Sequence, residues 1–122
     1  MIKLLIADDH SFFVQGVTLS LSDTNITVLD HLSRTEEIID AYIRLKPDVL
    51  ICDIMFGQEQ NGFDILKELL IKVPDAKVIL LSQYDQDKMI KQSYKLGAKA
   101  FLSKSIARDD LIIAIQTVAN GE

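Results

Sequence analysis

Side chains that can handle a phosphoryl group stand at the ends of four short, largely apolar runs of the sequence. These side chains are the acidic pair Asp8 and Asp9, the carboxylate of Asp53, the hydroxyl of Ser82 and the ammonium of Lys104. If the runs are parallel strands, their carboxyl ends meet at one edge of the sheet, where ligands bind in open α/β folds. The five side chains are therefore expected to converge there.

Three carboxylates at one point repel one another, and burial would raise their pKa values unless a positive charge neutralises them. A small hard cation such as Mg²⁺ binds a few carboxylate or carbonyl oxygens, keeps several waters and coordinates phosphate oxygens. With such an ion present, a carboxylate can attack phosphorus as a nucleophile. Asp53 is the expected nucleophile because its strand is central, whereas Asp8 and Asp9 are better placed to hold the metal. Lys104 would add a positive charge, and Ser82 a hydroxyl donor, to the bound phosphate.

The elements that must position these groups follow from the hydrophobic pattern. Short apolar runs rich in β-branched residues alternate with helix-length segments, which predicts five β-then-α units. The expected strands are 2–7, 26–31, 48–53, 77–82 and 99–103, and the expected helices are 11–22, 34–45, 61–73, 86–96 and 106–120. Such alternation predicts a flavodoxin-like, doubly wound parallel sheet with helices on both faces. The polar second strand fits a sheet edge, so the expected strand order is 2-1-3-4-5, with a switch point between the first and third strands.

Caps and one chain reversal are expected at the helix ends. Ser33 with Glu36 is expected to form a capping box for the second helix, and Asp85 and Ser105 to cap the fourth and fifth. Gly97 suits the reversal from the fourth helix into the last strand, because glycine tolerates a positive φ.

Composition bounds the class of protein. The 122 residues, 48% hydrophobic and 25% charged, fit one globular domain. A net charge of −5 with scattered basic residues argues against nucleic-acid binding by this chain. The single cysteine, Cys52, cannot form an internal disulfide and fits a reducing compartment. Because every apolar run is far shorter than the roughly 18 residues of a membrane span, a cytoplasmic protein without membrane contact is expected.

On these residues the sequence resembles the receiver domain of bacterial two-component response regulators, over essentially all of its length. The matching positions are the acidic pair Asp8 and Asp9, the phosphoacceptor Asp53, the switch hydroxyl Ser82, the switch aromatic Phe101 and the lysine Lys104. By this resemblance the chain accepts a phosphoryl group from a sensor histidine kinase in a phosphorelay. It is then not an enzyme, but a domain that assists its own phosphorylation and dephosphorylation.

The resemblance also implies which groups surround the metal and the phosphoryl group. The metal ligands would be Asp9 directly, Asp8 mostly through water, Asp53, and the backbone carbonyl of Met55. The phosphoryl oxygens would be met by Ser82, Lys104 and the backbone N–H groups of Met55 and Gln83.

Three stretches, residues 7–16, 81–85 and 118–122, resemble the NarL/LuxR-type subfamily. Members of that subfamily usually carry a helix-turn-helix output domain after the receiver. Residues 1–122 are therefore expected to be a single receiver domain, with DNA contacted through an output domain that they do not include. A stand-alone receiver is the alternative.

Three positions depart from the family pattern. Gly57 stands four residues after Asp53, where a proline is usual, and the loop that follows is about one residue longer than usual. Ser105 rather than proline follows Lys104, and Gln83 replaces a smaller residue after the switch hydroxyl. None of these changes removes a chemical group.

Other functions remain open on the sequence. A Mg²⁺-dependent phosphatase with an aspartyl nucleophile usually has a second Asp two residues later as general acid, but here that position is Met55. A flavodoxin-like cofactor binder would need a hydroxyl- and Gly-rich phosphate loop after the first strand, where Asp8 and Asp9 stand. A receiver that is never phosphorylated is disfavoured because every chemical group is present.

An apolar patch is expected on the outside of the first and fifth helices. On a helical wheel Phe12 and Leu19 point outward from the first helix and Ile113 from the fifth, with Ile112 at its flank. Because receivers of the resembled subfamily dimerise when phosphorylated, a homodimer through these helices is expected. An ordinary surface with a slightly rotated helix is the alternative.

Overall fold

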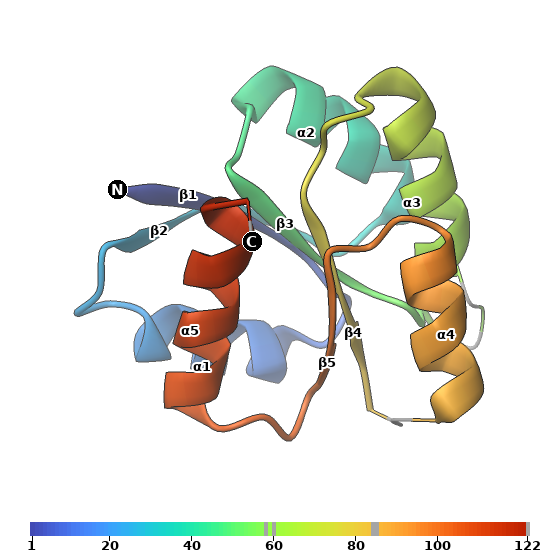
Figure 1. The fold of residues 1–122 in the computed structure, drawn as a ribbon. Helices are drawn as coiled ribbons and strands as arrows, with labels where there is room; N and C mark the ends of the chain where they lie inside the picture. Colours follow the sequence, from blue (N-terminus) through green and yellow to red (C-terminus); the bar gives the residue numbers. More distant parts are fainter. Residues whose placement is uncertain (58, 60, 84–85, 122) are drawn as a thin grey trace.

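The computed structural model of the chain describes residues 1–57, 59, 61–83 and 86–121. Its five strands are β1 (Ile2–Ala7), β2 (Ile26–Leu32), β3 (Val49–Asp53), β4 (Val78–Ser82) and β5 (Ala100–Ser103). Its helical segments are α1 (Ser11–Ser20), a 3₁₀ turn η1 (Thr35–Glu37), α2 (Ile38–Leu45), α3 (Asn61–Lys72), α4 (Asp87–Lys95) and α5 (Arg108–Ala119). The strands form one parallel sheet in the order β2-β1-β3-β4-β5, which confirms the predicted fold and strand order (Figure 1).

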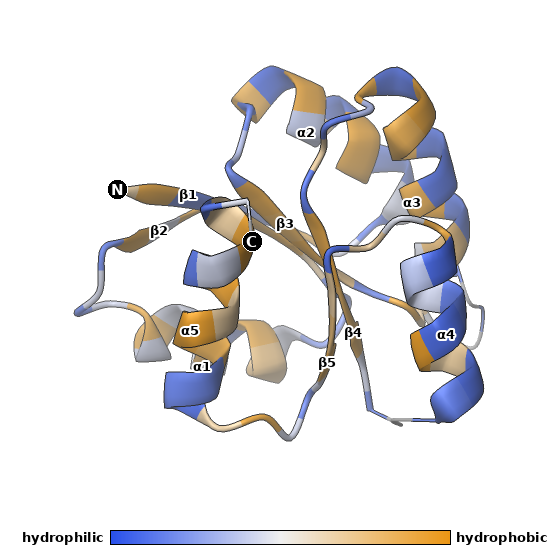
Figure 2. Ribbon diagram, viewed as in Figure 1, coloured by the Kyte–Doolittle hydropathy of each residue, from blue (hydrophilic) through white to orange (hydrophobic). Residues whose placement is uncertain are grey.

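Two helical layers cover the sheet, with α1 and α5 on one face and α2, α3 and α4 on the other (Figure 1). Alternate residues of each buried strand point to opposite layers, as the two-residue period of a strand requires. In β1, Leu4 and Ile6 pack under α1 and α5, while Leu5 and Ala7 pack under the other three helices. Figure 2 shows the matching pattern, with apolar central strands and helices that are apolar on one side. Both faces of the sheet are therefore core.

The strand β2 lies at an edge of the sheet, as its polar composition predicts. Thr27, Asp30 and His31 are exposed, while Ile26 and Leu32 at its two ends are buried. Its pairing with β1 shifts register between Leu4 and Leu5.

Two of the predicted helix caps are wrong. Ser33 and Glu36 do not form a capping box, because the Nε–H of Arg34 donates to Glu36 Oε1 at 2.7 Å and Arg34 occupies the cap position of η1. Ser105 does not cap α5, which begins after Ala107, two residues later than predicted.

The hydroxyl of Ser105 instead lies 2.8 Å from that of Ser103. The predicted cap Asp85 lies outside the described residues. Gly97 has a φ of +106°, which confirms the predicted reversal before β5.

The single cysteine is a core residue. Cys52 is buried on β3, and burial raises the pKa of its thiol far above neutrality. The thiolate, the reactive form, is therefore scarce at neutral pH.

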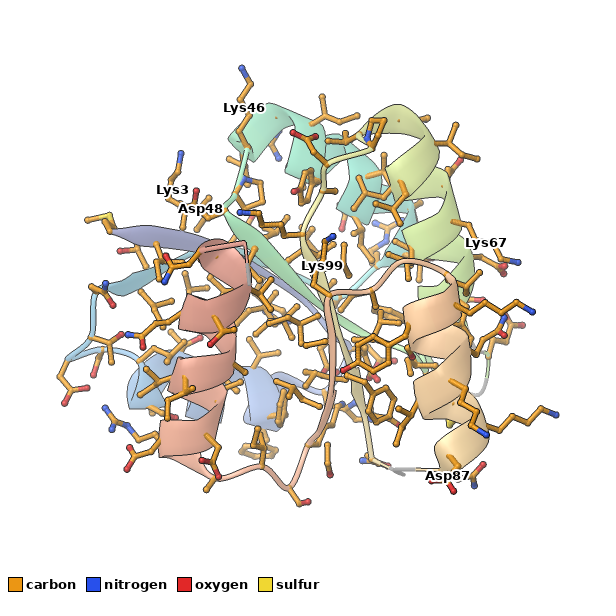
Figure 3. The ribbon with its side chains drawn as sticks, viewed as in Figure 1. Lys3, Lys46, Asp48, Lys67, Asp87 and Lys99 are labelled. Carbon is orange, nitrogen blue, oxygen red and sulfur yellow. The ribbon has the colours of Figure 1, made fainter. Side chains whose placement is uncertain are left out.

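The amino ends of the strands, opposite the site described below, carry charged groups. Lys3 and Asp48 lie close together there (Figure 3), and the backbone N–H of Lys3 donates to Asp48 Oδ2 at 2.7 Å. Lys46 and Lys67 point away from the core (Figure 3). Within the described part of the chain, each helix is too short or too polar to span a membrane.

Candidate functional site

The side chains predicted to converge do meet at the carboxyl edge of the sheet. Asp8 follows β1, Asp53 ends β3 and Lys104 follows β5. The Nζ atom of Lys104 lies 2.8 Å from Asp8 Oδ2 and 3.0 Å from Asp53 Oδ2. It also lies 4.9 Å from the ring centre of Phe13, which adds a cation–π contact. One ammonium group is thus shared by two carboxylates from neighbouring strands.

Burial makes these charges interact strongly. The side chains of Asp8 and Asp53 are 0% and 2% exposed, and that of Lys104 is 8% exposed. Burial and the neighbouring Asp8 carboxylate together raise the pKa of Asp53, against the opposing effects of Lys104 and the backbone N–H of Met55. The single ammonium therefore does not fully offset the cost of two buried carboxylates.

Asp9 forms the solvent-facing wall of the site. Its side chain is 31% exposed, and its Oδ2 accepts a hydrogen bond of 2.9 Å from the backbone N–H of Gly57. Gly57 has a φ of +66°, a conformation that favours glycine over the proline usual in the resembled family. The loop after β3 therefore helps to orient Asp9; residues 58 and 60 of that loop lie outside the described residues.

The other predicted site residues surround the same edge. The backbone N–H of Met55 donates to Asp53 Oδ1 at 3.2 Å. Ser82 is buried at the end of β4, and the exposed Gln83 follows it. Phe101 on β5 is half-buried and packs against the core on the α2–α4 face. Its backbone N–H donates to the phenol oxygen of Tyr94 on α4 at 3.3 Å.

His10 is a site residue that the sequence did not predict. Its Nδ1 atom lies 2.9 Å from Asp8 Oδ1, 3.3 Å from Asp9 Oδ1 and 3.5 Å from Asp53 Oδ2. The sequence feature that could have predicted its role is its position directly after the acidic pair, at the same end of the same strand. The carboxylates of Asp8, Asp9 and Asp53 are called the acidic cluster below, and His10 reaches all three.

The site fits a divalent cation. One atom each from Asp8, Asp9, His10 and Asp53 lie within 4.8 Å of one another. Among the described residues, the buried Asp8 Oδ2 has no hydrogen-bond partner, although it forms an ion pair with Lys104. This site has more buried carboxylate oxygens than donors and cations to pair with them, and carboxylate oxygens are ligands that Mg²⁺ binds.

Gly62, in the first turn of α3, brings that helix against the end of β3. Its N–H donates to the carbonyl of Ile54 at 2.8 Å. A Cβ atom at this position would lie 2.6 Å from the Cα of Ile54 and closer still to the carbonyl oxygen of Asp53. The backbone that carries Asp53 is therefore in contact with the start of α3.

Comparisons with known proteins agree with this geometry. Residues 4–116 match the family described as "Response regulator receiver domain". The chain is 32% identical over 119 residues to the chemotaxis protein CheY of Listeria monocytogenes, with 98% of this chain and 99% of CheY covered. It is 28% identical over 121 residues to the oxygen regulatory protein NreC of Staphylococcus carnosus, with 98% of this chain but only 56% of NreC covered.

Among solved structures, the signal receiver domain of NarL from Mycobacterium tuberculosis is similar to this chain with a TM-score of 0.90 at 23% identity. That match covers 99% of this chain and 98% of the NarL domain. The chain thus spans nearly all of CheY and about half of NreC.

Proposed function

We propose that Asp53 accepts a phosphoryl group from a sensor histidine kinase, because the chain belongs to the response regulator receiver domain family. The observation that carries the proposal is the buried Asp53 carboxylate, 3.0 Å from Lys104 Nζ and beside the acidic pair. An unpaired carboxylate is a weak nucleophile toward an anionic phosphoryl group, because like charges repel. This site has positive charge from Lys104 on one side and carboxylates that fit a cation on the other.

The chemistry divides among the residues of the site. Mg²⁺, held by Asp8, Asp9, Asp53 and the carbonyl of Met55, would neutralise the acidic cluster and coordinate a phosphoryl oxygen. An Asp53 carboxylate oxygen attacks phosphorus while the bond from phosphorus to the kinase histidine nitrogen breaks. Lys104, the hydroxyl of Ser82 and the N–H groups of Met55 and Gln83 then surround the transferred oxygens.

A signalling role fits this chain better than the alternative of a phosphatase. Aspartyl phosphatases usually have a proton donor two residues after the nucleophile, and the thioether of Met55 cannot donate a proton. Receiver domains are in general signalling modules without a catalytic function of their own. The domain assists the gain and loss of its own phosphoryl group only by positioning Lys104 and the metal ligands.

Phosphorylation requires divalent metal in this proposal. Incubation with acetyl phosphate and Mg²⁺ should add one phosphoryl group to the chain, and excess EDTA should prevent it. Asp9→Asn should weaken Mg²⁺ binding more than Asp8→Asn, because Asp9 is the expected direct ligand. Intact mass measures the labelling, and calorimetry measures the metal affinity of each variant. Full labelling in EDTA would refute the metal requirement.

We also propose that Ser82 and Phe101 form the switch. A phosphoryl group adds a charge of about −1.5 to −2, which attracts the Ser82 hydroxyl and the N–H of Gln83. As the loop after β4 moves toward this charge, it vacates space into which the half-buried ring of Phe101 can turn. The backbone N–H of Phe101 donates a hydrogen bond to the phenol of Tyr94, and a rotation of the Phe101 ring about its side-chain bonds leaves this contact unchanged. The Phe101 ring then has two packed positions in equilibrium, and the phosphoryl group shifts this equilibrium toward one of them.

Beryllofluoride, which stands in for the phosphoryl group, should therefore shift amide NMR signals at residues 82–86 and 99–104. Residues 84 and 85 of the first segment lie outside the described part of the structure. Signals at the far end of the sheet, such as those of Lys3 and Asp48, serve as the internal control and should hardly move. Unchanged signals in both switch segments, with beryllofluoride demonstrably bound, would contradict the switch.

We infer the process that this domain controls from the greater length of one of its relatives. The chain corresponds to about half of NreC, so we infer that it acts on transcription through an output domain outside these 122 residues. In this proposal DNA is contacted by that output domain and not by the acidic surface of this chain.

A homodimer through α1 and α5 completes the proposal. These helices lie side by side on one face of the sheet (Figure 1). Phe12, Leu19 and Ile113 are 90%, 74% and 59% exposed, and Ile112 is partly buried against the core. The residues that the helical wheel places outward, Phe12, Leu19 and Ile113, are thus exposed. A two-fold interface would cover this apolar patch on both molecules of the dimer.

Leu19→Glu or Ile113→Glu should abolish a weak dimer that beryllofluoride strengthens, while phosphorylation of Asp53 persists. A charge in the interface would have to be desolvated without a partner, which opposes association. Ile71→Glu is the matched control, because Ile71 is equally apolar and 81% exposed but lies on α3. Sedimentation that finds only monomer, at concentrations up to about 1 mM, would eliminate the dimer.

A further inference from the structure

Among the described residues, Lys104 Nζ has three close polar partners, and one of them is His10. The Nζ atom lies 2.8 Å from His10 Nδ1, 2.8 Å from Asp8 Oδ2 and 3.0 Å from Asp53 Oδ2. An ammonium group has three N–H donors, so each donor has a partner within reach. The Lys104 side chain is only 8% exposed, so these contacts, rather than water, decide where the ammonium group lies.

The contact with Lys104 requires a lone pair on His10 Nδ1, because an ammonium group can only donate. Asp8 Oδ1 also lies near this nitrogen, at 2.9 Å. That oxygen already accepts the backbone N–H of His10 at 2.8 Å, so it has a donor without the ring. The ring proton of His10 then belongs on Nε2, and Nδ1 is the acceptor for Lys104.

The three partners of Lys104 have different parts in the proposed function. Asp8 and Asp53 are metal ligands there, and Asp53 also becomes the phosphorylated residue. A carboxylate whose charge is shared with a divalent cation or a phosphoryl group is a weaker acceptor for an ammonium group. His10 Nδ1 takes part in neither step, so its strength as an acceptor is unchanged throughout.

We propose that His10 is a positioning residue that holds the Lys104 ammonium at the site while Asp8 and Asp53 engage the metal and the phosphoryl group. This role rests on the proposed function and adds a residue to it. His10 holds one N–H of Lys104, which leaves the other two to turn toward the phosphoryl oxygens. Without His10 the flexible lysine side chain is less firmly held, and the negative charge that develops during transfer is met by a less ordered cation.

His10→Leu tests this role, because leucine fills similar space without an acceptor atom. At saturating Mg²⁺, acetyl phosphate should label this variant about tenfold more slowly than the wild-type chain, the effect of about one hydrogen bond to a charged group. Its Mg²⁺ affinity, measured by calorimetry, should hardly change. Labelling at the wild-type rate would overturn the proposal. So would a loss seen only below saturating Mg²⁺, because His10 would then act on the metal.

Replacement of His10 by Nε2-methylhistidine is the matched control. The methyl group keeps the neutral ring with its lone pair on Nδ1, so this variant should be labelled at the wild-type rate. Labelling as slow as that of His10→Leu would overturn the proposal, because the acceptor atom is still present.

Nitrogen-15 NMR tests the position of the ring proton in the metal-free wild-type chain, at about pH 8.5, where free histidine is neutral. The chain has two histidines, and the His31→Gln variant identifies the signals of His10. The proton should be on Nε2, and a proton on Nδ1 would overturn the proposal. Failure of the wild-type chain to be labelled at all would instead refute the proposed function.

Discussion

Asp53→Asn should abolish the mass gain of about 80 Da, one phosphoryl group, that acetyl phosphate and Mg²⁺ produce in the wild-type chain. The amide cannot supply the anionic oxygen that attacks phosphorus, and Asp8 and Asp9 are the carboxylates that the proposal assigns to the metal. The loss should be complete within detection, because Asp53 is the carboxylate at the end of the central strand. Intact mass before and after incubation is the measurement.

Asp40→Asn is the control for this experiment. Asp40 is an exposed residue of α2 and lies outside the acidic cluster, so its variant should be labelled like the wild-type chain. A thermal stability of the Asp53 variant at or above that of the wild-type chain would show that the fold is retained. Undiminished labelling of Asp53→Asn would mean that another residue is the acceptor, and the proposed function would need a different site.

Gly62→Ala should destabilise the chain by about 2–3 kcal/mol, because the added methyl group overpacks a backbone contact. At the size of this domain that is a fall in Tm of about 10 °C. The Cβ atom would lie 2.6 Å from the Cα of Ile54, and a backbone atom cannot turn away as the end of a side chain can. To relieve the overlap, α3 must move away from β3 or the end of β3 must shift. Thermal unfolding measures the loss of stability, and labelling of Asp53 shows whether the end of β3 has shifted.

Gly16→Ala is the opposite case in the same chain. Gly16 lies in α1, and its added Cβ would meet no atom within 4 Å. Alanine is the better helix former by about 1 kcal/mol, so this variant should be more stable than the wild-type chain. If Gly62→Ala is as stable as Gly16→Ala, the close approach of α3 to Asp53 does not constrain the site.

The sheet was predictable from the sequence because its pattern is local and repeated. Runs such as Val49–Cys52 and Val78–Leu81 are apolar at every position, as strands buried on both faces must be. The strand order followed from one further property, the polarity of residues 26–31. Convergence of Asp8, Asp53 and Lys104 then followed from topology, because parallel strands share one carboxyl edge.

The parts that the sequence did not predict depend on partners rather than on pattern. The cap expected from Ser33 and Glu36 failed because Arg34, between them, binds the Glu36 carboxylate. The His10 ring contacts Lys104, which is 94 residues away in the sequence. Helical or strand periodicity contains no information about such contacts, so rotamers and caps emerge only with the assembled structure.

The hydrogen bond from Phe101 to Tyr94 also bears on the solubility of the chain. An edge strand exposes backbone donors and acceptors to which a strand of another molecule can add, which is a route to aggregation. β5 is an edge strand of four residues, and the phenol of Tyr94 occupies the N–H of Phe101 at 3.3 Å. One side chain of α4 thus shields this edge from intermolecular sheet extension. Replacement of Tyr94 by phenylalanine would leave that donor available to a neighbouring molecule.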